Sequence, residues 1–167
     1  MKGVDSLGFK FGGKNLNAAF IETLLEGIAA DCIELNFATC QCHTLELAQL
    51  LVAYFEKKGY DKSKLKGSIN FDPMEKMMKK AVNTTDKLAV APELVKTMQS
   101  IPGYRCVAVN SATLNDAGAY ISQELGYALA WGNEWMHQLT EAGIDADTAA
   151  KSIKFNMGIS GHYFLEL

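Results

Sequence analysis

Two clusters of polar residues in this sequence have the types and spacing that can support chemistry, and the first is CQCH, residues 40–43. The thiols of Cys40 and Cys42 and the imidazole of His43 are ligand types that zinc prefers. A zinc site needs three or four convergent ligands, and His137 and His162 lie far away along the chain. We therefore keep a thiol or metal site at CQCH as an alternative to the simpler interpretation, which is a loop of small residues between a strand and a helix.

The second cluster, called the rim residues below, follows two apolar segments at the points where each is expected to end as a strand. Its members are amides, hydroxyls and one carboxylate: Asn70, Asp72, Asn110, Ser111, Thr113 and Asn115. Binding and catalytic groups gather at this carboxyl end in proteins with parallel strands. However, residues 106–120 (CVAVNSATLNDAGAY) contain neither histidine nor lysine. We expect hydrogen-bonding loop residues here, with Asp72 capping a helix that begins at Pro73.

Alternating helical and strand patterns are expected to position both clusters. Helical periodicity covers residues 16–27, 44–59, 92–103, 115–141 and 145–153. Strand patterns cover residues 8–13, 32–38, 65–72, 104–110 and 153–158, and one more helix is expected near His162. In the longest helix we predict a buried stripe of Ile121, Leu125, Ala128, Trp135 and Leu139. Glu124 lies in this apolar stretch and is expected to pair with a neighbour or cap a backbone group.

Length and composition narrow the class of protein. With 167 residues, 49% of them hydrophobic, the chain is expected to form one domain with a substantial core. The net charge of −3 argues against a nucleic-acid-binding surface or an acidic-membrane surface. No apolar run has the length of a membrane span, and the first residues do not form a secretory signal. A cytoplasmic protein with reduced thiols is therefore expected.

The alternation of strands and helices predicts an α/β fold with a parallel sheet and crossover helices. Two architectures fit this order, an open doubly wound sheet and a partial (β/α)8 TIM-type barrel. No GxGxxG or GxxxxGK[ST] loop is present, which removes the main support for a nucleotide-binding open sheet. A full barrel takes about 250 residues. We therefore predict four to five parallel βα units, without the first and last parts of a barrel, and self-association through an open sheet edge.

An ordered set of motifs carries a family resemblance, namely DAGA (116–119), EL (124–125), GID (143–145), KF (154–155) and FLE (164–166). Together they resemble the barrel domain of the adenosylcobalamin-dependent acyl-CoA mutases, specifically the methylmalonyl-CoA mutase family. GSINFDPMEK (67–76) is similar to that family's Gly-Thr-Ile-Gln-Asn-Asp strand end. The resemblance covers about residues 6–167. It implies an acyl-CoA-binding barrel from an isomerase that interconverts methylmalonyl-CoA and succinyl-CoA.

The departures from the family pattern imply a loss of catalysis. Catalytic chains of the family carry a Tyr-His pair where this sequence has Ala112 and Thr113. Residues 81–91 contain no arginine, and Arg105 is the single arginine of the chain, so a bidentate carboxylate clamp is hard to build. The sequence also contains no Asp-x-His-x-x-Gly motif of a cobalamin-binding domain. The resemblance is thus to the non-catalytic small subunit of the heterodimeric enzymes, here a fragment that binds neither substrate nor cobalamin.

Three functions stay open at this stage. The first is a structural small-subunit fragment that packs against the catalytic large subunit. The second is a vestigial or weak acyl-CoA-binding module of a cobalamin-dependent isomerase. The third is an unrelated α/β protein with a thiol or metal site at Cys40, Cys42 and His43, for which bound zinc would be the discriminating observation.

Overall fold

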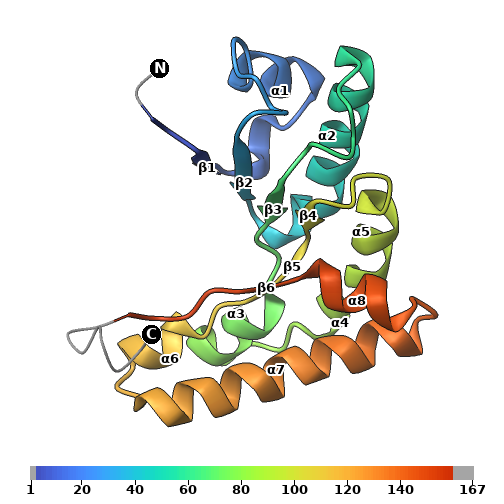
Figure 1. Ribbon diagram of the computed structural model, residues 1–167. Helices are drawn as coiled ribbons and strands as arrows, with labels where there is room; N and C mark the ends of the chain where they lie inside the picture. Colours follow the sequence, from blue (N-terminus) through green and yellow to red (C-terminus); the bar gives the residue numbers. More distant parts are fainter. Residues whose placement is uncertain (1–2, 160–167) are drawn as a thin grey trace.

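The computed structural model describes residues 3–159, and all of its paired strands are parallel (Figure 1). The α/β class and the parallel sheet predicted from the sequence are confirmed. The strands are β1 (Ser6–Lys10), β2 (Glu34–Ala38), β3 (Gly67–Ile69), β4 (Tyr104–Arg105), β5 (Val107–Val109) and β6 (Ile153–Phe155). Each of the predicted strands is present, although most are shorter than the sequence patterns. The helix predicted near His162 lies outside the described residues.

The strands follow one another in space in the order in which they occur in the chain. One sheet has the order β1-β2-β3-β4, and β5 pairs with β6. Cys106 separates β4 from β5, and its backbone N–H donates to the carbonyl of Ser152 at 2.9 Å. The N–H of Ala108 donates to the carbonyl of Phe71 at 2.9 Å, so β5 lies beside the segment that follows β3. The described strands therefore show no reversal of order of the kind that defines a doubly wound sheet.

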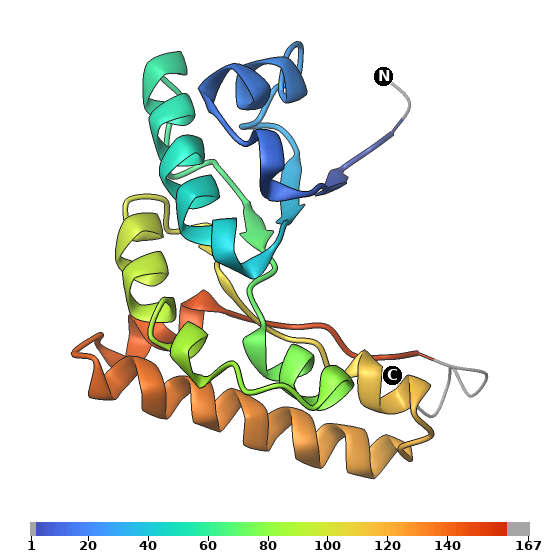
Figure 2. The same ribbon diagram turned by 180° about the vertical axis from the view of Figure 1, so that it is seen from behind.

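The helices cover one side of these strands. They are α1 (Ala18–Leu24), α2 (Thr44–Lys58), α3 (Pro73–Lys80), α4 (Thr85–Leu88), α5 (Ala91–Met98), α6 (Ala112–Asp116), α7 (Ile121–Glu141) and α8 (Ala146–Ser152), with short 3-10 turns η1 (Gly13–Asn15) and η2 (Gln41–His43). Both views show α2 and α5 side by side against β2–β4 (Figures 1 and 2). Leu35 and Phe37 of β2 are buried in one core with Leu47 and Leu51 of α2. None of the helices within residues 3–159 is long and apolar enough to cross a membrane.

The opposite face of the strands is polar. Side chains alternate between the two faces of a strand, so Asn36 points away from the core that holds Leu35 and Phe37. Asn36 is the register partner of Ser68, and the Ser68 hydroxyl donates to its side-chain oxygen. Lys154 Nζ donates to Asn36 Oδ1 at 3.1 Å and to Ser68 Oγ at 3.0 Å. Hydrogen bonds thus link β2, β3 and β6 across this face.

The single helix predicted over residues 115–141 is wrong, because the chain breaks it into α6 and α7. Gly118 lies between them with φ of +93°, in a region of backbone conformation that favours glycine. A new helix then begins after Tyr120, whose backbone N–H donates to Gln123 Oε1 at 2.8 Å. The predicted stripe is also wrong at Leu125, which is 47% exposed, whereas Glu124 is 3% exposed. Ala128, Trp135 and Leu139 of the predicted stripe are buried, so the departure from the apolar pattern is confined to the start of α7.

Candidate functional site

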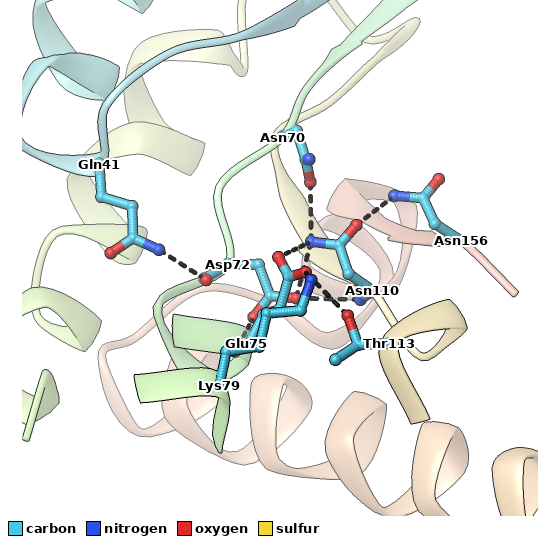
Figure 3. Close-up of polar contacts among 8 residues, drawn as sticks. All are labelled: Gln41, Asn70, Asp72, Glu75, Lys79, Asn110, Thr113 and Asn156. Atoms are coloured by element: carbon cyan, nitrogen blue, oxygen red, sulfur yellow. Dashed lines mark hydrogen bonds and ion pairs between the residues drawn. The ribbon is translucent and has the colours of Figure 1, made fainter. Parts of the chain in front are cut away.

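The rim residues come together at the carboxyl ends of β3 and β5, as the sequence predicts, but in two separate groups. Asn70 and Asp72 follow β3, Asn110 follows β5, and Thr113 lies on α6. Asp72, Asn110 and Thr113 each hydrogen-bond to Glu75 of α3, which the sequence pattern did not single out, and Asn70 joins them through Asn110 (Figure 3). The remaining two, Ser111 and Asn115, bind elsewhere. The sequence feature that could have identified Glu75 is its position three residues after Asp72, the predicted helix cap.

The side chain of Asn110 is the centre of the first group. Its Nδ2 atom lies 3.1 Å from Asn70 Oδ1, 2.9 Å from Asp72 Oδ2 and 3.1 Å from Glu75 Oε2. Its Oδ1 atom accepts a hydrogen bond of 2.7 Å from Asn156 Nδ2, which lies just after β6. Because the amide has two N–H groups and three neighbouring acceptors, its donors are fully engaged. This buried amide ties the ends of three strand segments together.

Asp72 combines a helix cap with a strongly perturbed carboxyl group. It is 3% exposed, and its Oδ1 accepts from the Glu75 backbone N–H at 3.0 Å, which confirms the predicted cap. Its Oδ2 accepts from the Asn110 backbone N–H at 2.9 Å. Burial raises the pKa of Asp72 to about 7, and the nearby charge of Glu75 adds to the effect, against the lowering by these donors. The group can exchange a proton near neutral pH, but protein donors occupy both of its oxygens.

Thr113 completes the first group from the side of α6. Its hydroxyl donates to Glu75 Oε1 at 2.8 Å, and the same oxygen lies 2.7 Å from Lys79 Nζ (Figure 3). Thr113 stands at the position that the family resemblance assigns to the substrate-contacting histidine. The side-chain donor of Thr113 is therefore used in a hydrogen bond within the protein.

The second group forms around the buried carboxylate of Glu124. Ser111 Oγ donates to Glu124 Oε1 at 3.0 Å, and Asn115 Nδ2 donates to Glu124 Oε2 at 3.0 Å. The backbone N–H of Gly158 donates to Oε1 at 2.7 Å. The partners expected for Glu124 therefore come from the end of β5, from α6 and from the segment after β6. Its position in an apolar stretch was the sequence signal for such a buried pairing.

The CQCH cluster brings its two thiols together but turns its imidazole elsewhere. Cys40 Sγ and Cys42 Sγ are 2.9 Å apart and exposed. His43 Nδ1 lies 3.0 Å from Glu46 Oε2 on α2. Within residues 3–159, no three or more His, Cys, Asp or Glu side chains converge so that they can hold a metal ion. Gln41, between the thiols, donates through Nε2 to the carbonyl of Asp72 at 2.6 Å, so this loop touches the rim.

A second polar region lies at the other end of the strands. A hollow of about 720 Å³ is lined by Glu34 at the start of β2, by the residues that lead into β3 and β4, by Arg105, and by the end of α8 with all of β6, so most of its lining lies toward the amino ends of the strands. Its charged lining residues are Glu34, Lys66, Arg105, Lys151 and Lys154. Four cations and one carboxylate give this hollow a positive charge in a chain whose net charge is −3. The sequence offered no signal for it beyond the single arginine.

Fold and sites together define a parallel α/β protein with a hydrogen-bonded polar rim at the carboxyl ends of its strands and a cationic hollow at the amino ends. The family model described as methylmalonyl-CoA mutase matches residues 17–167. This match covers most of the chain, and the chain belongs to the methylmalonyl-CoA mutase family. The resemblance inferred from the ordered motifs is confirmed.

The relatives include both subunit types. The chain is 40% identical over 166 residues to a methylmalonyl-CoA mutase small subunit of Porphyromonas gingivalis, and covers 99% of its own length and 27% of that protein. It is 26% identical over 165 residues to the small subunit of Streptomyces virginiae, again with 99% and 27% covered. With the large subunit of Streptomyces virginiae it shares 28% identity over 151 residues, which is 86% of this chain and 20% of that protein. The chain thus spans about a quarter of the length of these small subunits.

Proposed function

We propose that this chain is part of a structural, non-catalytic small subunit of a methylmalonyl-CoA mutase, and that residues 1–167 form part of its (β/α)8 barrel without a cobalamin-binding domain. Parallel strands that neighbour each other in chain order support the barrel. The similarity to small subunits from two organisms over 99% of this chain supports the subunit type. In this proposal the protein is cytoplasmic, and its partner is the catalytic large subunit.

The non-catalytic part of the proposal rests on one observation, namely that the rim side chains form hydrogen bonds with other groups of the protein. A working site keeps donors and charges directed at a substrate, whereas each rim residue here has at least one side-chain polar atom hydrogen-bonded within the protein. Asn110 is held by Asn70, Asp72, Glu75 and Asn156. Thr113 is held by Glu75, and Ser111 and Asn115 are held by Glu124.

The same observation bears on the cofactor of the family. The rim amides and hydroxyls are engaged with one another, and the residue in the histidine position is Thr113, whose hydroxyl binds Glu75. These residues do not fit a group that must be contacted from the rim. We therefore assign adenosylcobalamin, and the isomerisation itself, to the large subunit.

A titration experiment tests the proposal. Isothermal calorimetry of the 167-residue chain with methylmalonyl-CoA, with and without adenosylcobalamin, is expected to show no saturable heat from rim binding. Mixing with the purified large subunit is expected to give a complex that co-elutes in size-exclusion chromatography. Turnover by the chain alone, or a folded chain that never co-elutes with the large subunit, would contradict the proposal.

A second candidate function is weak acyl-CoA binding, which the cationic hollow favours. Coenzyme A carries several phosphate charges, and Lys66, Arg105 and Lys151 line the hollow without an ion-pair partner among residues 3–159. If calorimetry detects acyl-CoA binding, Arg105→Ala should abolish most of it, whereas Thr113→Ala at the rim should leave it unchanged. The opposite pattern would place the binding at the rim.

We also propose that the isolated chain self-associates. β1 is the last strand on one side of its sheet, and β6 is the last strand next to β5. Unpaired edges of parallel sheets offer backbone N–H and C=O groups to another chain. Light scattering coupled to size-exclusion chromatography is expected to report a dimer or larger species that dissociates on dilution. A single monomeric species throughout would show that these edges do not pair.

A further inference from the structure

The two thiols of the CQCH loop form an exposed pair that the proposed function does not use. Cys40 ends the extended segment after β2, and Cys42 lies within η2, which leads directly into α2. This turn brings Cys40 Sγ and Cys42 Sγ to 2.9 Å, which is closer than two non-bonded sulfur atoms normally approach. A disulfide needs a separation of about 2.05 Å, so the sulfurs must approach by less than about 1 Å.

The surroundings of the pair make its two members unequal. The pKa of the Cys40 thiol is lowered, first by the hydrogen bond from the Cys42 thiol, then by the Cys42 backbone N–H and by the charges of His43 and Lys76. The pKa of Cys42 is raised, chiefly because its proton is shared with Cys40. The thiolate is the reactive form of cysteine, so Cys40 is the nucleophile of the pair and Cys42 keeps its proton.

The other two cysteines serve as internal references. Cys32 is exposed, and its thiol lies 3.7 Å from the carboxylate of Asp31, with no second thiol beside it among the hydrogen bonds of residues 3–159. Cys106 is buried between β4 and β5, and burial raises its pKa to about 12. Among residues 3–159, Cys40 and Cys42 are therefore the only exposed cysteines with a neighbouring thiol, and Cys40 is the member whose thiolate is stabilised.

We propose that Cys40 and Cys42 form a redox-active dithiol that is oxidised to an intramolecular disulfide by low-molecular-weight disulfides such as oxidised glutathione. The Cys40 thiolate attacks one sulfur of the oxidant, forms a mixed disulfide and releases one glutathione thiolate. Cys42 then loses its proton to solvent and attacks Cys40 Sγ, which breaks the mixed disulfide and releases the second glutathione. The dithiol loses two electrons, and the oxidant is reduced to two thiols.

The test uses the reduced 167-residue chain, equilibrated without oxygen in a series of glutathione buffers from reducing to oxidising. Acid quenching, alkylation and peptide mass spectrometry then report the state of each cysteine. We expect Cys40 and Cys42 to lose their free thiols together, with a mass loss of two hydrogen atoms, while Cys32 carries only a glutathione adduct. Persistent glutathione adducts on Cys40 or Cys42, or free thiols at both in buffers that modify Cys32, would overturn the proposal.

Two matched variants test the order of the steps. Cys42→Ser keeps a hydroxyl donor beside Cys40 but removes the resolving thiol, so a stable glutathione adduct is expected at Cys40. Cys40→Ser removes the attacking thiolate, and the adduct at Cys42 is expected to form several-fold more slowly at neutral pH, because the charges of His43 and Lys76 act on Cys40 and not on Cys42. Equal rates in the two variants, with unchanged circular dichroism, would contradict the roles assigned to the two cysteines. Both side chains are exposed, so neither variant is expected to unfold the chain.

Discussion

Polar residues gather at both ends of the strands, but at the carboxyl ends they are hydrogen-bonded to one another, and at the amino ends they line an open hollow. At the carboxyl ends, amides, hydroxyls and carboxylates bind one another, and the charged groups Asp72 and Glu124 are buried. At the amino ends, Lys66, Arg105 and Lys151 face a hollow with Glu34 as the single carboxylate of its lining. The position of a polar cluster in an α/β fold therefore does not reveal whether it can bind a ligand. What distinguishes the ends is whether their polar groups are already used within the protein.

The largest effect on stability is expected from removing the buried carboxylate of Glu124 at the carboxyl ends of the strands. Glu124→Ala leaves the Ser111 hydroxyl, the Asn115 amide and the Gly158 N–H without their buried acceptor. We expect a loss of about 3 kcal/mol in the free energy of unfolding, measured by urea denaturation. Glu124→Gln keeps the shape and one acceptor oxygen and should cost about half as much. A loss below about 1 kcal/mol in the alanine variant would mean that the rim is not held together by this carboxylate.

The pH dependence of the free energy of unfolding tests whether burial controls the protonation of Asp72. Its pKa of about 7 in the folded state lies above its ordinary value of 3.8, so between these values the folded chain binds more protons than the unfolded chain. Stability from this group is therefore full below about pH 4 and is lost as the pH rises toward 7. In Asp72→Asn this decline should disappear from urea unfolding measured across the range, an effect on the order of a few kcal/mol.

Asp145 provides a matched control for that experiment. It also caps a helix, α8, and its side chain accepts from the Thr148 backbone N–H at 3.0 Å, but it is exposed. The Thr148 hydrogen bonds lower the pKa of Asp145, so its contribution is present at neutral pH and is lost as the pH falls below its ordinary value. Asp145→Asn should thus change the acid side of the profile. The same change of slope in both variants would show that burial does not set the behaviour of Asp72.

The smallest expected effect on stability is at the amino ends. Arg105 is exposed and makes no ion pair among the described residues, so Arg105→Ala should change the free energy of unfolding by less than about 0.5 kcal/mol. Its larger effect should be on the binding of inorganic pyrophosphate, measured by calorimetry. A large loss of stability in this variant would mean that the hollow, like the rim, is held together by internal contacts.

The local features of the fold were predictable from the sequence, and the long-range contacts of the site were not. Alternating patterns gave the parallel α/β fold, and the position of Asp72 before Pro73 gave a cap that the structure confirms. The break at Gly118 was missed because apolar periodicity continues through it. The exposure of Leu125 was missed because the apolar spacing places it on the same face as Ala128, whereas long-range partners draw the neighbouring Glu124 into the protein. Gly158, one of those partners, lies 34 residues further along the chain.

The carboxylate of Glu124 also has a consequence for how such a protein can change over evolutionary time. Its three donors come from two parts of the chain, residues 111–115 and Gly158, so a substitution in one part leaves a buried group unmatched in the other. We therefore expect Glu124 and its side-chain donors to change together, through replacements at two or more of these positions. A site without catalysis can then be as slow to vary as an active one. Invariance at Ser111 or Asn115 among relatives would therefore reflect the need to satisfy the buried Glu124 carboxylate rather than a retained reaction.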